Sequence, residues 1–299
     1  METKDVCSRV RFQIVRIFLV PFRNRGLENA RARLLSLVKK IFRSYLWTSL
    51  QGHKMYVNAR DKTITPTLLN YGVWEMHETE LFKRAVRKGM IVVDLGANIG
   101  WYTLIAAKLV GKKGKVYAFE PEPDNCALLR KNVQLNGYSN VIIERKAVLD
   151  RYGSIRLFLN SDNLGDHRIY DSHDGRKSIT VEGTTLDEYF RNEHDNIDVI
   201  KIDIQGAEMA ALLGMDRVIK ANENLKMFIE FGPTAISRSG FSPREFLNKL
   251  FEYGFKIYVI EIQKEFTEQT HVDEIMESCE GKEFVDLFLS RPRKPVQRG

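Results

Sequence analysis

From residue 91 onward, the sequence alternates between short apolar runs and segments with helical spacing of apolar residues. This alternation is typical of a parallel sheet with helices on its faces. Seven runs predict strands, at 91–95, 115–120, 140–145, 197–203, 225–231, 255–261 and 283–290. Helices are expected over 99–110, 124–136, 185–193, 206–220 and 242–253. We therefore predict an α/β fold with a doubly wound, seven-stranded, mostly parallel sheet.

One stretch interrupts the alternation between the third and fourth predicted strands. Residues 154–160 and 177–183 have the composition of two antiparallel strands, with a long polar segment between them. A loop of this length in a compact domain is either a lid over a binding site or a surface excursion. The sequence predicts a β-hairpin insertion here and leaves both interpretations open.

Charge divides the chain into parts of different character. The first 50 residues hold 11 lysines or arginines and 3 acidic residues, a net charge of +8, whereas the rest of the chain carries −1. We expect a basic, partly helical N-terminal extension over 1–50, one domain over 51–290 and a basic, disordered tail over 291–299. Cys7, Cys126 and Cys279 lie far apart, which predicts neither a disulfide framework nor a zinc site.

The N-terminal extension has two interpretations. Residues 30–47 have helical spacing, with an apolar face formed by Leu34, Val38, Ile41, Phe42 and Tyr45. Such a helix either docks on its own domain or lies on an anionic membrane surface. The apolar run at 13–22 is too short to span a bilayer, which needs about 20 apolar residues, and no signal-peptide cleavage site follows it. We expect a cytoplasmic protein, with peripheral attachment to the inner face of the membrane as the second interpretation.

The first predicted strand leads into a turn with two glycines, DLGANIG at residues 94–100. Dinucleotide-binding turns usually carry three glycines spaced G-x-G-x-x-G, because their backbone presses against a pyrophosphate. Here the carboxylate of Asp94 enters the turn, where it would repel a pyrophosphate and attract an ammonium group. The turn therefore argues against a dinucleotide ligand.

Acidic residues end four of the predicted strands, namely Asp94, Glu120, Asp203 and Glu230. Ligands of open α/β sheets bind beyond the carboxyl ends of the strands, near the point where the strand order reverses. Glu120 ends the second strand, where a carboxylate commonly binds ribose hydroxyls. S-adenosylmethionine has a ribose, an adenine and an amino-acid end but no phosphate, so we predict it as the cofactor.

The motifs VVDLGANIGWYT, FEPEP, TLDEYF, IDVIKIDIQGAEMAALLGM and FIEFGP occur in this order along the chain. In these motifs the chain resembles the FkbM-type family of S-adenosylmethionine-dependent methyltransferases, which have the Rossmann-like class I fold, over roughly residues 70–290. The resemblance implies a methyltransferase domain over 51–290. It also implies a set of cofactor-binding residues: Asp94, Gly96, Ala97, Asn98 and Gly100 at the methionine part, Glu120, Pro121 and Glu122 at the ribose, Lys146 and Ala147 at the adenine, with Thr103 and Glu75 as additional candidates. For Glu75, the alternative is an acid at a helix N-terminus.

The chain departs from the family's motif at one position, where KIDIQGAE replaces the common KIDVEGAE. No carboxylate is available at Gln205, although Asp203 and Glu208 remain. The loop of the insertion offers six metal-ligand side chains, Asp162, Asp166, His167, Asp171, His173 and Asp174. Their irregular spacing is typical of a solvated loop, and we predict no required metal.

Methyl transfer to oxygen requires the acceptor to lie in line with the sulfonium methyl, at roughly 3 to 3.5 Å. A general base contributes about 10²- to 10⁴-fold for a hydroxyl acceptor. Asp203 is the first candidate for the base, followed by Glu230 and His167, although Asp203 could instead only cap the next turn. We expect an O-methyltransferase acting on a hydroxyl of a sugar, glycan or other small molecule, with no specific nucleic-acid partner. The alternatives are a nucleic-acid methyltransferase that uses the basic arm and a non-catalytic S-adenosylmethionine-binding protein.

Overall fold

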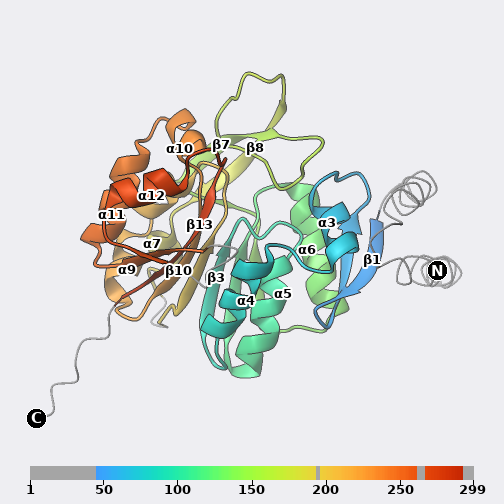
Figure 1. Ribbon diagram of the computed structural model, residues 1–299. Coiled ribbons are helices and arrows are strands. Elements are labelled where there is room, and N and C mark those ends of the chain that lie inside the picture. Colours follow the sequence, from blue (N-terminus) through green and yellow to red (C-terminus); the bar gives the residue numbers. More distant parts are fainter. Residues whose placement is uncertain (1–44, 193–195, 261–266, 292–299) are drawn as a thin grey trace, which may run out of the picture.

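The computed structural model describes residues 45–192, 196–260 and 267–291 (Figure 1). Its central sheet has eight strands in the order β12-β11-β13-β10-β9-β3-β4-β5. Five neighbours run parallel: β10 (Lys226–Phe231), β9 (Val199–Ile202), β3 (Ile91–Leu95), β4 (Lys115–Phe119) and β5 (Val141–Glu144). The chain winds outward from β3 through β4 to β5 and then returns to β9 on the other side of β3. The strand order therefore reverses between β3 and β9.

The far side of the sheet is antiparallel. Strand β13 (Val285–Ser290) lies between β10 and β11 (Lys256–Val259) and runs opposite to both. The predicted α/β, doubly wound and mostly parallel fold is confirmed, and all seven predicted strands are present. The eighth strand, β12 (Thr267–Gln269), was not predicted, because three residues on a sheet edge are too few to show a periodic pattern.

Helices cover both faces of the sheet (Figure 1). Alternate residues of each strand point to opposite faces, so the strands feed two separate apolar clusters. One cluster joins the sheet to α3 (Ile64–Tyr71), α4 (Met76–Ala85), α5 (Trp101–Val110) and α6 (Pro123–Leu135). The other joins it to α7 (Leu186–Tyr189), α8 (Glu208–Leu213), α9 (Asp216–Ala221), α10 (Pro233–Arg238), α11 (Pro243–Glu252) and α12 (Val272–Ser278). A 3₁₀ turn, η2 (Gly111–Lys113), follows α5.

Two predicted helices differ from the observed ones. The helix expected over 206–220 is divided into α8 and α9 at Gly214. Here the backbone packs against the segment at Leu149, and a Cβ added to Gly214 would lie 1.8 Å from the Leu149 carbonyl oxygen. The helix expected over 185–193 is reduced to α7, whose N-cap Thr185 accepts a hydrogen bond from the Glu188 N–H (3.2 Å). Contacts distant in sequence therefore set where these helices end.

The segments flanking the sheet were predicted in part. Strands β1 (Tyr45–Leu50) and β2 (His53–Asn58) form an antiparallel hairpin, so the helix expected over 30–47 is wrong for its last three residues. The rest of the N-terminal extension and most of the predicted tail lie outside the described residues. Arg291, the first residue of that tail, is held by hydrogen bonds to the carbonyl oxygens of Tyr253, Ile219 and Asn222 (2.9–3.0 Å). No helix in the described part of the chain is long and apolar enough to cross a membrane.

The predicted β-hairpin insertion is confirmed. Strands β7 (Gly153–Leu159) and β8 (Lys177–Thr184) pair antiparallel, and β6 (Ala147–Val148) adds a short parallel strand to them. This three-stranded sheet is separate from the central one. Its loop, 160–176, returns toward the carboxyl ends of the central strands.

Candidate active site

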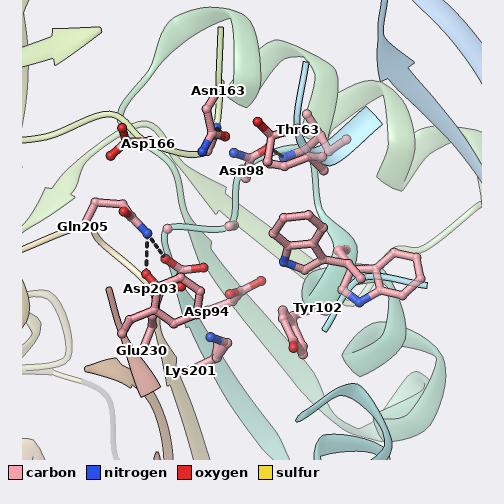
Figure 2. A pocket seen from close by; sticks show the side chains of 18 of the residues that line it. Thr63, Asp94, Asn98, Tyr102, Asn163, Asp166, Lys201, Asp203, Gln205 and Glu230 are labelled. Atoms are coloured by element: carbon pink, nitrogen blue, oxygen red, sulfur yellow. Dashed lines mark hydrogen bonds between the residues drawn. The ribbon is translucent and has the colours of Figure 1, made fainter. Parts of the chain in front are cut away.

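A cavity of about 320 Å³ opens beyond the carboxyl ends of β3, β9 and β10, where the strand order reverses (Figure 2). Acidic, amide and aromatic side chains line it, among them Trp74, Asp94, Asn98, Tyr102, Lys201, Asp203, Gln205 and Glu230. A second cavity of about 50 Å³ adjoins it and shares Gly96, Asn98, Gly165, Asp203 and Gln205 with it. The four acidic strand ends predicted to lie together, Asp94, Glu120, Asp203 and Glu230, therefore line these two adjoining cavities.

The turn after β3 is closely packed against its surroundings. Gly96 has φ +80°, and a Cβ added there would lie 1.9 Å from the Asp203 carbonyl oxygen. The five N–H groups from Gly96 to Gly100 all donate within the protein, two of them to the Phe119 carbonyl oxygen (3.0 Å). The turn is thus held in a fixed shape and presents its side chains to the cavity.

Asp94 and Thr103 act as a pair. The Thr103 hydroxyl donates a hydrogen bond to Asp94 Oδ2 (2.5 Å), and both side chains are buried. Burial raises the pKa of Asp94 to about 6, against the opposing effect of this hydrogen bond. Thr103 therefore orients Asp94 from behind, while Asp94 itself lines the cavity.

Glu120 ends β4 at the smaller cavity, as expected of a ribose-binding carboxylate. Its two oxygens accept hydrogen bonds from the backbone N–H groups of Asn98 and Glu122, both at 2.8 Å. Burial nevertheless raises its pKa to about 8. Pro121 and Ala147 line the same cavity. Two anchored acceptor oxygens beside a narrow pocket fit a ribose with its adenine.

Two other predicted cofactor residues make local contacts. Glu122 caps α6, because its Oε2 accepts a hydrogen bond from the Asn125 N–H (2.6 Å). Lys146 forms an ion pair with Glu182 of the insertion (3.0 Å). These contacts give both side chains a structural role beside the cavity.

The loop of the insertion lies over the site. The Leu164 carbonyl oxygen accepts hydrogen bonds from the side-chain amides of Asn98 (3.1 Å) and Asn125 (2.9 Å). The Leu164 N–H in turn donates to Asp61 Oδ1 (3.1 Å), which ties the loop to the segment after β2. This position supports the lid interpretation. Sequence reasoning missed Asn125 and Asp61, whose partner is a backbone group far along the chain.

Several of the six side chains weighed as metal ligands are engaged within this loop; Asp174 pairs with Arg176 (2.6 Å), and Asp171 accepts a hydrogen bond from the His173 N–H (2.8 Å). Asp166 forms ion pairs with Arg168 (2.5 Å) and Arg176 (2.8 Å). His167 lines the smaller cavity, and its Nδ1 accepts a hydrogen bond from the Asn160 N–H (3.1 Å). Burial lowers the pKa of His167 to about 4, which makes its imidazole a weak proton acceptor at neutral pH.

Asp203 and Glu230 lie side by side at the ends of β9 and β10, linked by Gln205 (Figure 2). The Gln205 amide donates hydrogen bonds to Asp203 Oδ1 (2.9 Å) and Glu230 Oε1 (2.5 Å). Burial and the neighbouring Asp203 raise the pKa of Glu230 well above its usual range. A carboxylate at 205 would add a third acid to this pair, whereas the amide bridges it. The glutamine at this position therefore suits the site, because its amide donates hydrogen bonds to both acids.

A second polar network forms the floor of the cavity. The Tyr102 hydroxyl lies 2.9 Å from Glu75 Oε2 and 2.8 Å from Glu78 Oε2. Glu78 forms an ion pair with Lys201 (3.2 Å), and both are almost fully buried. Oxygens of Glu75, Asp203 and Glu230 lie within 4.8 Å of one another, so this floor adjoins the acid pair.

Sequence reasoning named only Glu75 of this network. One signal was available, because Lys201 is a charged residue inside the apolar run VIKI of a central parallel strand, where apolar residues are the rule. Its partner Glu78 lies on α4, more than 100 residues earlier, and no spacing in the sequence connects the two.

The residues of the site fit S-adenosylmethionine. Gly96 lets the turn pack against the Asp203 carbonyl oxygen, Asp94 offers a carboxylate for the ammonium group, and Glu120 offers two oxygens for the ribose. Lys201 adds a buried cation within the larger cavity. Asp94 and Lys201 thus provide the negative and the positive charge that match the amino-acid end of S-adenosylmethionine.

Comparison with known families agrees with this fit. The model of the methyltransferase FkbM domain matches residues 94–257. The model of protein-L-isoaspartate(D-aspartate) O-methyltransferase matches residues 35–147. The two matches overlap over the segment that contains the turn after β3 and Glu120, which is the cofactor side of the site.

Individual relatives match only a short segment of this chain or share little sequence identity with it. The chain is 36% identical to the protein-L-isoaspartate O-methyltransferase of Methanococcoides burtonii over 58 residues, 19% of this chain and 29% of that protein. The matched segment thus spans less than a third of that relative. Among solved structures, a SAM-dependent O-methyltransferase from Thermotoga maritima is similar with a TM-score of 0.42 and 13% identity, covering 87% of this chain and 83% of that one. An rRNA methylase from Streptococcus thermophilus has a TM-score of 0.42 and 14% identity, covering 74% and 98%. These likenesses are too remote to identify an acceptor.

Proposed function

The chain belongs to the methyltransferase FkbM domain family, whose members use S-adenosylmethionine, and from this premise we propose that it methylates a hydroxyl of a sugar, glycan or other small molecule. The observation that supports an oxygen acceptor is the pair of carboxyls, Asp203 and Glu230, bridged by Gln205 in the cavity beside the cofactor turn. Such a pair accepts hydrogen bonds from hydroxyl groups and takes up the proton that O-methylation releases.

The chemistry assigns different roles to the two acids. S-adenosylmethionine supplies an electrophilic methyl group on sulfur. With the cofactor bound, transfer of that methyl group to a hydroxyl oxygen would release S-adenosylhomocysteine and the hydroxyl proton, and the role of the protein would be to take up that proton. Asp203 lines both the larger and the smaller cavity, whereas Glu230 lines the larger one, so Asp203 is the carboxylate placed next to the cofactor turn and serves as the base.

The walls of the cavity favour a neutral acceptor with several hydroxyls. Trp74 and Phe284 line it with aromatic rings, against which the apolar face of a sugar can pack. Lys201 is its single basic side chain among the described residues, whereas five of its side chains are acidic: Asp94, Asp166, Asp203, Glu230 and Glu283. A polyphosphate backbone would meet net negative charge here, which disfavours a nucleic-acid acceptor.

The test begins with identification of the acceptor, by mass spectrometry of glycans and lipids from cells with and without the gene. With that acceptor, Asp203→Asn should lower turnover at least about a hundredfold, the scale of general-base assistance. Calorimetry should show nearly unchanged affinity for S-adenosylhomocysteine. Asp150→Asn, at an exposed carboxylate on the surface, is the control and should retain full turnover. If Asp203→Asn loses turnover and cofactor affinity together, Asp203 is a structural residue and the proposed base is wrong.

A further inference from the structure

The floor of the larger cavity contains a buried ammonium group whose hydrogen bonds are not met. The side chain of Lys201 is 1% exposed, and its Nζ makes no hydrogen bond with the described atoms. Its closest partners are Glu78 Oε2, in an ion pair at 3.2 Å, and the ring of Tyr102, whose centroid is 5.0 Å away. The carboxyl groups of Asp203, Glu75 and Asp286 also interact with it electrostatically. An ammonium group has three donors, and a buried donor without an acceptor is costly. Lys201 also lines the cavity, where Figure 2 shows it beside Asp94 and Glu230.

The carboxylate of a bound S-adenosylmethionine needs a partner in the same place. In many helix-leading turns the backbone N–H groups bind such an anion. Here the N–H groups from Gly96 to Gly100 are already used, by Phe119, Glu120, Asn98 and Ala97. The acids that line the cavity would repel a carboxylate, so the buried cation is the remaining group of suitable charge.

The sheet register places opposite charges side by side. Asp94 of β3 and Lys201 of β9 are direct neighbours across the parallel strands, and neighbouring strands lie about 4.8 Å apart. Both side chains line the same cavity. An α-amino acid carries its ammonium and its carboxylate on one carbon atom. The Asp94–Lys201 pair therefore matches the zwitterionic end of the cofactor, with one charge for each of its groups.

We propose that Lys201 binds the α-carboxylate of S-adenosylmethionine while Asp94 binds its ammonium group. This inference rests on the cofactor and is independent of which acceptor the enzyme methylates. Glu78 and Tyr102 act as positioning residues, because they hold the Lys201 side chain at the cavity floor.

The experiment compares two ligands that differ only in this carboxylate. Calorimetry would measure the affinities of the wild-type chain for S-adenosylmethionine and for decarboxylated S-adenosylmethionine. A charged hydrogen bond predicts at least about tenfold tighter binding of the intact cofactor. Lys201→Met should bring the two affinities to within about twofold of each other, by weakening only the intact cofactor. Lys220→Met, which removes a lysine paired with Asp216 on α9 and outside the lining of both cavities, is the matched control and should keep the wild-type ratio.

Loss of the buried cation could unfold the domain, because Glu78 would be left unpaired. The double variant Lys201→Met with Glu78→Gln removes both charges, and it should fold and give the same equalised affinities. A ratio that stays at the wild-type value in a folded variant overturns the proposal. So does an equal weakening of both ligands, since that identifies Lys201 as structural, and so does a wild-type chain that does not distinguish the ligands. None of these outcomes depends on the proposed hydroxyl acceptor.

Discussion

The hydroxyl of Tyr102 lies within hydrogen-bonding distance of two carboxyl groups, those of Glu75 and Glu78. A hydroxyl has one proton, so it can donate to only one of them, and the other carboxyl must hold a proton and donate to the phenol oxygen. Glu78 pairs with the ammonium of Lys201, which leaves Glu75 as the protonated partner. Burial raises the pKa of Glu75 well above its usual range, in agreement with this assignment.

The assignment predicts opposite outcomes for two similar substitutions. Glu75→Gln should change the free energy of unfolding by less than about 1 kcal/mol, because the glutamine amide replaces the carboxylic proton as donor to Tyr102. Glu78→Gln should cost about 3 kcal/mol, since it removes one partner of a buried ion pair. Urea unfolding of the two variants checks this. A larger loss for Glu75→Gln than for Glu78→Gln would show that Glu75 is the ionised member.

At the scale of residues, local motifs predicted much of the site. Asp94, Glu120, Asp203 and Glu230 were named from strand ends alone, and all four reach the two cavities. The network of Glu78, Tyr102 and Lys201 was missed, because its members come from α4, α5 and β9. Only tertiary packing brings these three residues together, and their spacing along the sequence gives no indication of the contact.

At the scale of elements, the junction between β3 and α5 is closely packed against the chain after β9. Gly96→Ala should destabilise the chain by about 1 to 2 kcal/mol for its positive φ and by about 1 to 3 kcal/mol more for the clash with the Asp203 carbonyl oxygen. Gly72→Ala is the matched control, because Gly72 has a similar φ of +74° and open space around it. Urea unfolding and calorimetry with S-adenosylhomocysteine should show that only Gly96→Ala loses the cofactor. Equal behaviour of the two variants would mean that the turn tolerates displacement.

Elements were predictable where their pattern is local. The central strands are continuous apolar runs, and α11 has Ser242 as its N-cap and Pro243 in its first turn, two local signals of a helix start. The break between α8 and α9 was not predictable, because it depends on the approach of Gly214 to Leu149 from a distant segment. The first three residues of β1 were taken for helix, because the pairing of this strand with β2, not its own periodicity, determines its structure.

At the scale of the whole molecule, we propose that the basic arm attaches the enzyme to an anionic membrane surface. Deleting residues 1–44 removes all 11 basic residues of the arm and leaves β1 intact. Each basic residue near such a surface contributes about 1 kcal/mol, so the full chain should sediment with anionic liposomes and be released by high salt. The truncated chain should stay in solution and still bind S-adenosylhomocysteine. A full chain that does not sediment would show that the arm does not bind the membrane. A truncated chain that unfolds would show that the arm has a structural role instead.

The larger cavity is assembled from segments of different origin. The family match ends at residues 94 and 257, yet Thr63, Ile64 and Trp74 line the cavity from before it, and Glu283 and Phe284 from after it. Asp94, Glu120 and Lys201, the groups assigned to the cofactor, lie within that match. The walls that come from outside it can therefore be substituted to change which acceptor fits, without altering the residues assigned to the cofactor.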